Sequence, residues 1–190
     1  MNVRYFDNAA TTRVKDEVLE EMLPYLKEKF GNPSSMYTIG REAKKAIENA
    51  RERVAKLINC KANEIYFTGS GSESDNTAIK GIAHKRAFKG KHIITSKIEH
   101  PAVLHTCQSL EREGFKVTYL NVNKDGIVDI NQLINSIRND TILISIMYAN
   151  NEIGTIQPIH DIAKIAKMHN IVFHTDAVQV IGKEMIFFFF

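Results

Sequence analysis

Hydrophobic residues recur along this chain with two different periods, and the periods predict its secondary structure. Apolar positions three and four residues apart indicate amphipathic helices, whereas short apolar runs rich in β-branched residues indicate buried strands. The first pattern predicts helices over residues 14–29, 39–59, 72–86, 101–113, 129–136 and 158–169. The second pattern predicts strands over residues 64–68, 91–96, 116–121, 141–148 and 171–175. Strands that alternate with helices are typical of the α/β class, with a mostly parallel sheet and helices on both faces.

The two helices that precede the first strand carry signals of their own. Pro24 inside the first helix predicts a kink or a break at that point. In the second helix, the apolar residues that share one side are Ala43, Ala46, Ile47, Ala50, Val54, Leu57 and Ile58. We expect that side to face the interior.

Polar side chains follow several of the predicted strands at the point where each strand ends. Residues 68–76 (TGSGSESDN) place glycines and serines directly before a helix, and a helix amino terminus with free N–H groups binds phosphate well. His100 follows the second strand, Asn151 the fourth, and Asp176, with Gln179, the fifth. Because the carboxyl ends of parallel strands meet at one edge, these groups would face one crevice.

Each of these groups has an ordinary structural explanation when it is taken alone. The glycines and serines could form a capped turn, and they lack both the P-loop ending and the GxGxxG spacing. A lone histidine is more often solvated, an Asn pair is common in turns, and Asp176 could cap a helix. Together they indicate a ligand with a phosphate and a group that needs a carboxylate. Pyridoxal 5'-phosphate fits, because a paired acid keeps its pyridine nitrogen protonated.

Composition limits the other classes of function. The 25 Lys and Arg are scattered among 22 Asp and Glu with a net charge of +3, so no nucleic-acid partner is indicated. Cys60 and Cys107 form no CxxC pair, which favours the cytoplasm over a disulfide framework or a zinc site, and no metal site is predicted. Cys107 and His105 do not face each other on a helix, so a thiol nucleophile is disfavoured. Neither a signal peptide nor a membrane-spanning segment is predicted.

Taken together, the motifs resemble the cysteine desulfurases of the NifS/IscS type, in the class V aminotransferase group of pyridoxal-phosphate enzymes of fold type I. The resemblance covers the chain up to about Lys183 and rests on YFDNAATT, FGNPSS with the following GR, FTGSGSESDN, EHPAVL, NNEIGTIQPI and HTDAVQVIGK. It implies removal of sulfur from L-cysteine, which leaves L-alanine, for iron–sulfur cluster or thionucleoside synthesis. The implied partners are a sulfur acceptor or scaffold protein and a second copy of the chain.

The resemblance also implies roles for individual residues. It places Gly71 and Ser72 at the cofactor phosphate, and His100 over the ring as an acid/base group. It places Asn151 and Gln179 at the oxygen substituent of the ring. Asp176 would meet the pyridine nitrogen.

Several family positions have no counterpart in this sequence. Tyr37 stands where the family usually has His. The Schiff-base lysine, the persulfide cysteine and the arginine for the substrate carboxylate are absent, and Lys183 matches a position without a catalytic role. Two later strands, which in this fold type lie between strand 64–68 and the rest of the sheet, are absent as well. We therefore expect the first half of such an enzyme, inactive alone.

These expectations divide the chain into three parts. Residues 1–14 would be an N-terminal segment of the small domain, residues 15–183 an incomplete cofactor-binding large domain, and residues 184–190 an aberrant apolar tail. A fragment of a related class V aminotransferase or of a selenocysteine lyase is an alternative. So is a non-enzymatic product of a pseudogene or a binding module. A generic nucleotide-binding domain ranks last, because its glycine pattern is absent.

Overall fold

The structure is a computed structural model, and it describes residues 4–182. The chain forms two compact units, one that ends at Phe67 and one that begins at Thr68. The second unit contains the described strands and the polar groups of the predicted site.

The second unit is built around a parallel four-stranded sheet with the order β2-β1-β3-β4. The strands are β1 (His92–Ser96), β2 (Lys116–Leu120), β3 (Thr141–Ser145) and β4 (Val172–His174). The central strands β1 and β3 are buried at every position, as their continuous apolar sequences predict. The chain passes from β1 outward to β2 and then back across β1 to β3. This reversal is a topological switch point, where sheets of this kind bind ligands.

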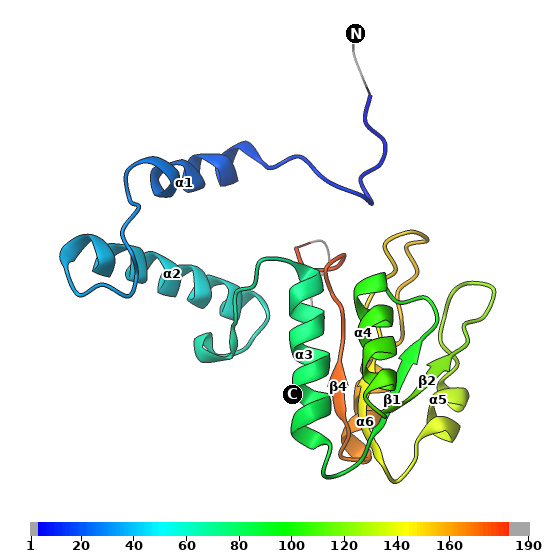
Figure 1. Ribbon diagram of the computed structural model, residues 1–190. Helices are drawn as coiled ribbons and strands as arrows, with labels where there is room; N and C mark the ends of the chain where they lie inside the picture. The colour runs from blue at the N-terminus through cyan, green and yellow to red at the C-terminus, as the bar shows by residue number, and fades with distance from the viewer. Residues whose placement is uncertain (1–3, 183–190) are drawn as a thin grey trace. The chain divides into compact units, whose positions relative to one another are not determined.

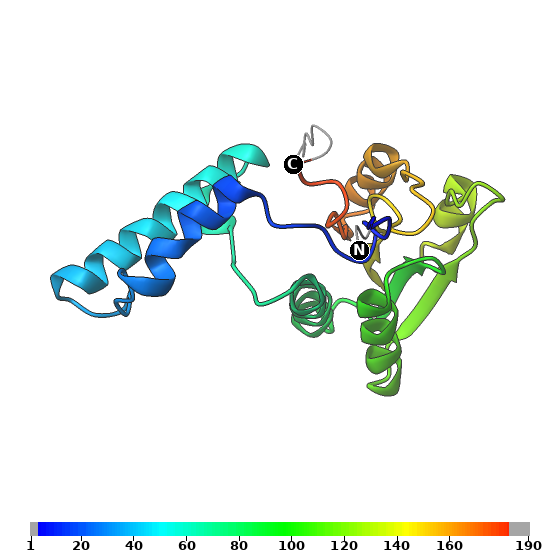
Figure 2. The same ribbon diagram turned by 90° about the horizontal axis from the view of Figure 1, so that it is seen from above.

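Helices cover both faces of this sheet, as predicted (Figures 1 and 2). One face carries α3 (Gly71–Arg86) and α4 (Pro101–Arg112), and the other carries α5 (Ile130–Ser136) and α6 (Ile159–Met168). Right-handed crossovers explain this division, because the chain moves one way along the sheet after β1 and the other way after β2 and β3.

Each face of the sheet has its own hydrophobic cluster. Ile93 and Leu143 pack with Ile79 of α3 on one face, while Ile94 packs with Ile162 of α6 on the other. Neighbouring residues of a strand point to opposite faces, so Ile93 and Ile94 separate in this way. The two clusters fix the register that brings the strand ends to a common edge.

The first unit contains α1 (Asp16–Lys27), α2 (Thr38–Leu57) and the short 3-10 helix η1 (Ala62–Glu64). The predicted break at Pro24 does not occur, since α1 continues to Lys27 and the Pro24 carbonyl accepts the Glu28 N–H at 2.9 Å. No residue of α1 is buried.

The predicted inner side of α2 is largely exposed, which corrects the expectation. Ala43 is buried, but Ile47, Val54 and Leu57 are exposed. The apolar stripe is present as predicted, but a helix buries such a stripe only where another element covers it. The described residues leave most of this stripe uncovered.

The strand predicted over residues 64–68 is also wrong for the described structure. Glu64 ends η1, and the following residues have no regular structure, with Tyr66 82% exposed. An extended segment becomes a strand only when a neighbour pairs with its N–H and C=O groups. None of the described strands pairs with this segment.

The two ends of the chain add little to the described fold. Residues 4–15 contain neither helix nor strand, and the predicted tail over residues 184–190 lies outside the described residues.

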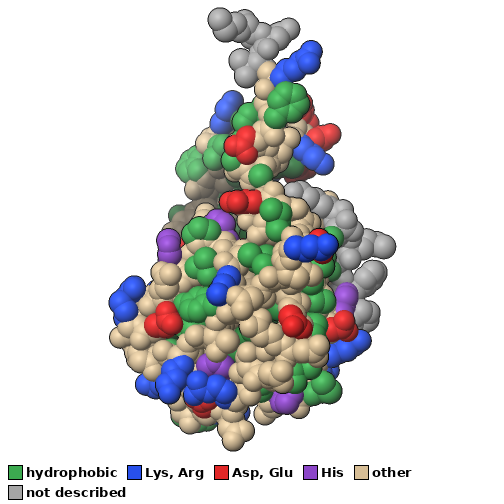
Figure 3. All heavy atoms as spheres, turned by 90° about the vertical axis from the view of Figure 1, so that its right-hand side faces the viewer, with side chains coloured by type: hydrophobic (Ala, Val, Ile, Leu, Met, Phe, Trp, Pro, Cys, Tyr) green, Lys and Arg blue, Asp and Glu red, His purple; other side chains and the backbone are tan. Residues whose placement is uncertain are grey.

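On the face that Figure 3 shows, Lys and Arg side chains are interspersed with Asp and Glu. No helix within residues 4–182 is long and apolar enough to cross a membrane.

Candidate functional site

The loops that follow β1 and β3 are joined by hydrogen bonds at the carboxyl edge of the sheet. Glu99, after β1, accepts the Met147 N–H with both carboxylate oxygens at 3.0 Å, and it accepts the Ser96 hydroxyl at 2.5 Å. The Asn150 side chain donates to the Ile98 carbonyl at 3.0 Å. These bonds connect the two loops beside the switch point of the sheet.

Glu99 is buried, and its protonation reflects that position. Burial is the main cause that raises the pKa of its carboxyl to about 7. The hydrogen bonds from Ser96 and Met147 oppose this increase, whereas the negative charges of Asp176 and Asp75 add to it. Three carboxyl groups thus interact electrostatically at one edge of the sheet.

The amino terminus of α3 lies where the sequence has its glycines and serines. Ser70 caps the helix, because its hydroxyl accepts the Glu73 N–H at 3.2 Å, and the Glu73 carboxylate accepts the Gly69 N–H at 2.7 Å. Gly71 and Ser72 are the first two helical residues. The N–H groups of a first helical turn have no carbonyl partner within the helix and lie at the positive end of its dipole. This end of α3 can therefore bind an anion.

The start of α3 is packed closely against the segment that follows β4. A Cβ atom at Gly71 would lie only 3.1 Å from Cγ2 of Val178, so a glycine allows this approach. Val178 lies two residues after Asp176, and its N–H donates to Asp176 Oδ1 at 3.0 Å. The first turn of α3 and the carboxylate of Asp176 are thus contributed by adjacent segments.

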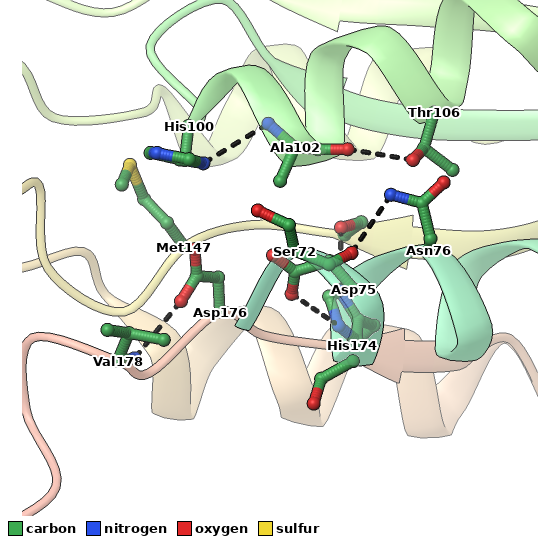
Figure 4. Close-up of polar contacts among 12 residues, drawn as sticks. Ser72, Asp75, Asn76, His100, Ala102, Thr106, Met147, His174, Asp176 and Val178 are labelled. Atoms are coloured by element: carbon green, nitrogen blue, oxygen red, sulfur yellow. Dashed lines mark hydrogen bonds and ion pairs between the residues drawn. The ribbon is translucent and has the colours of Figure 1, made fainter. Parts of the chain in front are cut away.

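Asp176 is held by its backbone as well as by its side chain. Its carbonyl accepts the Tyr148 N–H at 2.8 Å, just as the His174 carbonyl accepts the Ile146 N–H at 3.1 Å. The pairing between the third and fourth strands therefore continues beyond their ends to Asp176. The carboxylate is partly buried, and it accepts the Val178 N–H (Figure 4).

His100 lies at the amino terminus of α4, where it is exposed. Its Nδ1 accepts the Ala102 N–H at 3.1 Å (Figure 4). In the neutral ring this leaves the proton on Nε2, so Nε2 is the atom that can donate to a ligand. The proline that follows His100 begins the helix without the loss of a hydrogen bond.

The two predicted amide residues lie in turns at the same edge. Asn151 is in the turn after β3 and Gln179 in the turn after Asp176, and both are partly buried. The preceding Asn150 shapes the first turn, because its Oδ1 accepts the N–H groups of Glu152 and Ile153. All the predicted site residues therefore lie on segments at the carboxyl edge of the sheet or at the start of α3.

Sequence reasoning assigned no role to three ionisable residues at this edge, Glu99, Asp75 and His174. His174 Nδ1 is 2.9 Å from the Ser145 hydroxyl, and its Nε2 is 3.6 Å from Asp75 Oδ1 of α3 (Figure 4). Strand periodicity could have indicated His174, because it lies two residues before Asp176 and so points to the same face. Glu99 follows β1 directly before His100, so the strand-end rule could have indicated it as well.

Comparison with known proteins identifies the family. Residues 4–188 match the family described as aminotransferase class-V. The chain belongs to this family. It is 64% identical over 178 residues to the cysteine desulfurase IscS of Methanosarcina thermophila, an alignment that covers 94% of this chain and 44% of that protein. The chain spans about half the length of the curated relatives it matches. The resemblance inferred from the motifs is thereby confirmed.

Solved structures support the same assignment. A NifS-like protein matches with a TM-score of 0.93 and 47% identity, over 96% of this chain and 51% of that one. A protein described as SspA in complex with cysteine matches with a TM-score of 0.94 and 46% identity, over 97% of this chain and 53% of that one. The predicted fold class, an α/β large domain of pyridoxal-phosphate enzymes, is confirmed by these neighbours.

Enzymes of this family use pyridoxal 5'-phosphate, and the described residues fit that cofactor. It needs an anion site for its phosphate and a carboxylate for its pyridine nitrogen. The first turn of α3 offers N–H groups, and Gly71 leaves its backbone open to close approach. The carboxylate of Asp176 follows on the adjacent segment, with one oxygen oriented by the Val178 N–H.

Proposed function

We propose that this chain is the amino-terminal half of a pyridoxal-phosphate-dependent cysteine desulfurase. The observation that carries the proposal is the close packing of Gly71 against Val178, which brings the first turn of α3 next to the segment that carries Asp176. Relatives named cysteine desulfurase, one of them 64% identical, support the reaction class. The similar structure in complex with cysteine supports L-cysteine as the substrate.

The proposed cofactor residues have distinct roles. The N–H groups at Gly71 and Ser72 bind the phosphate, and Asp176 holds the proton at the pyridine nitrogen. Asn151 and Gln179 bind the oxygen substituent of the ring. The cofactor, when bound, supplies an electron sink for chemistry at the substrate's α-carbon.

His100 is proposed as the acid/base group over the ring. Its Nδ1 is engaged by the Ala102 N–H, which fixes the orientation of the imidazole and leaves Nε2 to exchange a proton. The loop that carries His100 is fixed by its neighbour, because Glu99 bonds to Ser96 and Met147.

Two catalytic groups implied by the family have no match among these 190 residues, the lysine that binds the cofactor covalently and the cysteine that receives the sulfur. Cys107 is fully buried in α4, and Cys60 belongs to the other unit. We therefore propose that these residues alone bind the cofactor non-covalently and transfer no sulfur. The complete reaction would yield L-alanine and pass the sulfur to an acceptor or scaffold protein in the cytoplasm, with a homodimer as the functional form.

Equilibrium binding of pyridoxine 5'-phosphate tests this proposal. This analogue has the ring and phosphate of the cofactor but no aldehyde, so surface lysines cannot trap it. We expect D176N to bind it at least about tenfold more weakly than the wild-type chain, because a charge-assisted hydrogen bond contributes about 1.5–3 kcal/mol. The control is D161N, which removes an exposed carboxylate from α6. Equal affinities of D176N and the wild type would contradict the proposal, as would an absence of binding.

A further inference from the structure

The face of α3 that begins at Gly71 contacts the β4 segment at two points. Gly71 packs against Val178, and the Asp75 carboxylate lies 3.6 Å from Nε2 of His174. Gly71 and Asp75 are four residues apart, so they share one face of the helix. His174 and Val178 are also four residues apart, and Asp176 lies midway between them. Asp176 is thus flanked by the two contacts that fasten α3 to its segment.

The contact through His174 is largely buried, and the ring has a hydrogen-bond partner that orients it. The side chains of His174 and Asp75 are only 13% and 8% exposed. With its Nε2 proton toward Asp75, the imidazole accepts the Ser145 hydroxyl at Nδ1, at 2.9 Å. The ring therefore bridges β3 and α3, and its position fixes the strand just before Asp176.

His174 belongs to a row of polar residues across the sheet, and stability does not explain why this row is polar. Thr95, Ser145 and His174 are register neighbours on β1, β3 and β4, on the face that α3 covers. Thr95 is fully buried, and its hydroxyl has no hydrogen-bond partner among the described residues. A buried hydroxyl without a partner costs about 1–3 kcal/mol. Hydrophobic side chains would pack this face better, which favours a functional reason for the row.

We propose that His174 is a positioning residue that, with Asp75 and Ser145, sets the distance between the anion site of α3 and the carboxylate of Asp176. This inference rests on the proposed cofactor site. The ring end and the phosphate end of one rigid ligand must be met at the same time, so a small shift of α3 relative to Asp176 weakens binding of the whole ligand. A ligand that reaches only one end is insensitive to that shift.

The test compares two ligands, pyridoxine 5'-phosphate and inorganic phosphate, on the full 190-residue chain. We expect H174Q to bind pyridoxine 5'-phosphate about tenfold more weakly and to bind phosphate as the wild type does. S145A removes one hydrogen bond without leaving a charge unpaired, and we expect a loss of about threefold for pyridoxine 5'-phosphate alone. Circular dichroism checks that each variant is folded. If H174Q does not fold, the affinities of S145A decide the test.

The matched control is H92Q. His92 is a fully buried histidine at the opposite end of β1, bonded to the hydroxyls of Thr141 and Thr118. We expect H92Q to leave both affinities unchanged, although it also disrupts a buried network.

Three results would overturn the inference in distinguishable ways. Wild-type affinity of the folded variants for pyridoxine 5'-phosphate would exclude a positioning role. An equal loss for both ligands would indicate a general effect on the fold. If the wild-type chain bound pyridoxine 5'-phosphate no more tightly than inorganic phosphate, the proposed function would be refuted, and this inference with it.

Discussion

The carboxylate of Glu99 accepts the backbone N–H of Met147 with both oxygens, at 3.0 Å each. This contact joins the loop before α4 to the continuation of β3, across the switch point of the sheet. It also places a buried carboxyl directly before His100 and within the electrostatic influence of Asp176 and Asp75. The pairing therefore connects the stability of the fold to the charge of the proposed site.

Glu99 makes the stability of the chain depend on pH in a defined direction. Burial raises the pKa of the folded-state carboxyl from 4.5 to about 7. Its contribution to stability is therefore fully present below about pH 4.5 and is lost as the pH rises through 7. The shift corresponds to a difference on the order of 3 kcal/mol. We expect the free energy of unfolding of E99Q, relative to the wild type, to increase by this order between pH 4.5 and pH 8, as measured by urea denaturation.

The control for this experiment is E152Q, which removes an exposed carboxylate from the turn after β3. We expect its unfolding free energy to follow the wild-type pH dependence. If E99Q did so too, Glu99 would not be the group that titrates.

The close approach of Gly71 to Val178 predicts the effect of a small substitution. In G71A the new Cβ lies 3.1 Å from Val178 Cγ2, which is tighter than ordinary van der Waals contact. Val178 is 63% exposed and can move, so we expect only about a threefold loss of affinity for inorganic phosphate, equivalent to about 0.6 kcal/mol. Isothermal titration calorimetry measures this change.

The double variant G71A/V178A tests the cause of that loss. Removal of the Val178 methyl groups relieves the crowding, so we expect wild-type affinity to return, while V178A alone has no effect. A loss that persists in the double variant would exclude this contact as the cause.

Local sequence patterns predicted the second unit well because its elements cover one another. The sequences HIITS and TILIS are typical of central buried strands, and they form β1 and β3. The same reasoning failed for residues 64–68 and for the inner side of α2. Their patterns are correct for a strand and an amphipathic helix, but both need a neighbour, and a local pattern does not show whether that neighbour is present.

Part of the site could be predicted from each strand taken by itself. Polar residues after parallel strands meet at one edge, and this rule alone selected His100, Asn151 and Asp176. The rule could not give the contacts of Glu99 and Asp75, because their partners are distant in sequence. Glu99 meets Met147 at a separation of 48 residues, and Asp75 meets a histidine on the last described strand. Such pairs follow from register and packing, which the local pattern does not contain.

Because α1 is exposed, we expect a leucine-to-alanine substitution to cost less stability in α1 than in the core of the second unit. Leu26 is 70% exposed, whereas Leu143 is fully buried between the sheet and α3. We expect L143A to lower the free energy of unfolding by about 2–5 kcal/mol, because it leaves a cavity. L26A should change it by no more than about 0.5 kcal/mol. Chemical denaturation measures both, and a loss of several kcal/mol in L26A would show that α1 is packed in solution.

The two cysteines should differ in reactivity, and the difference tests whether either can act as a nucleophile. Cys107 is fully buried on α4, and burial raises the pKa of its thiol to about 12, so almost no thiolate forms at neutral pH. Cys60 is partly exposed. We therefore expect N-ethylmaleimide at pH 7.5 to label Cys60 and spare Cys107, as mass spectrometry of tryptic peptides would report. Labelling in urea provides the control, because unfolding removes the protection and both thiols then react. Rapid labelling of Cys107 in the folded chain would contradict its burial and restore it as a candidate nucleophile.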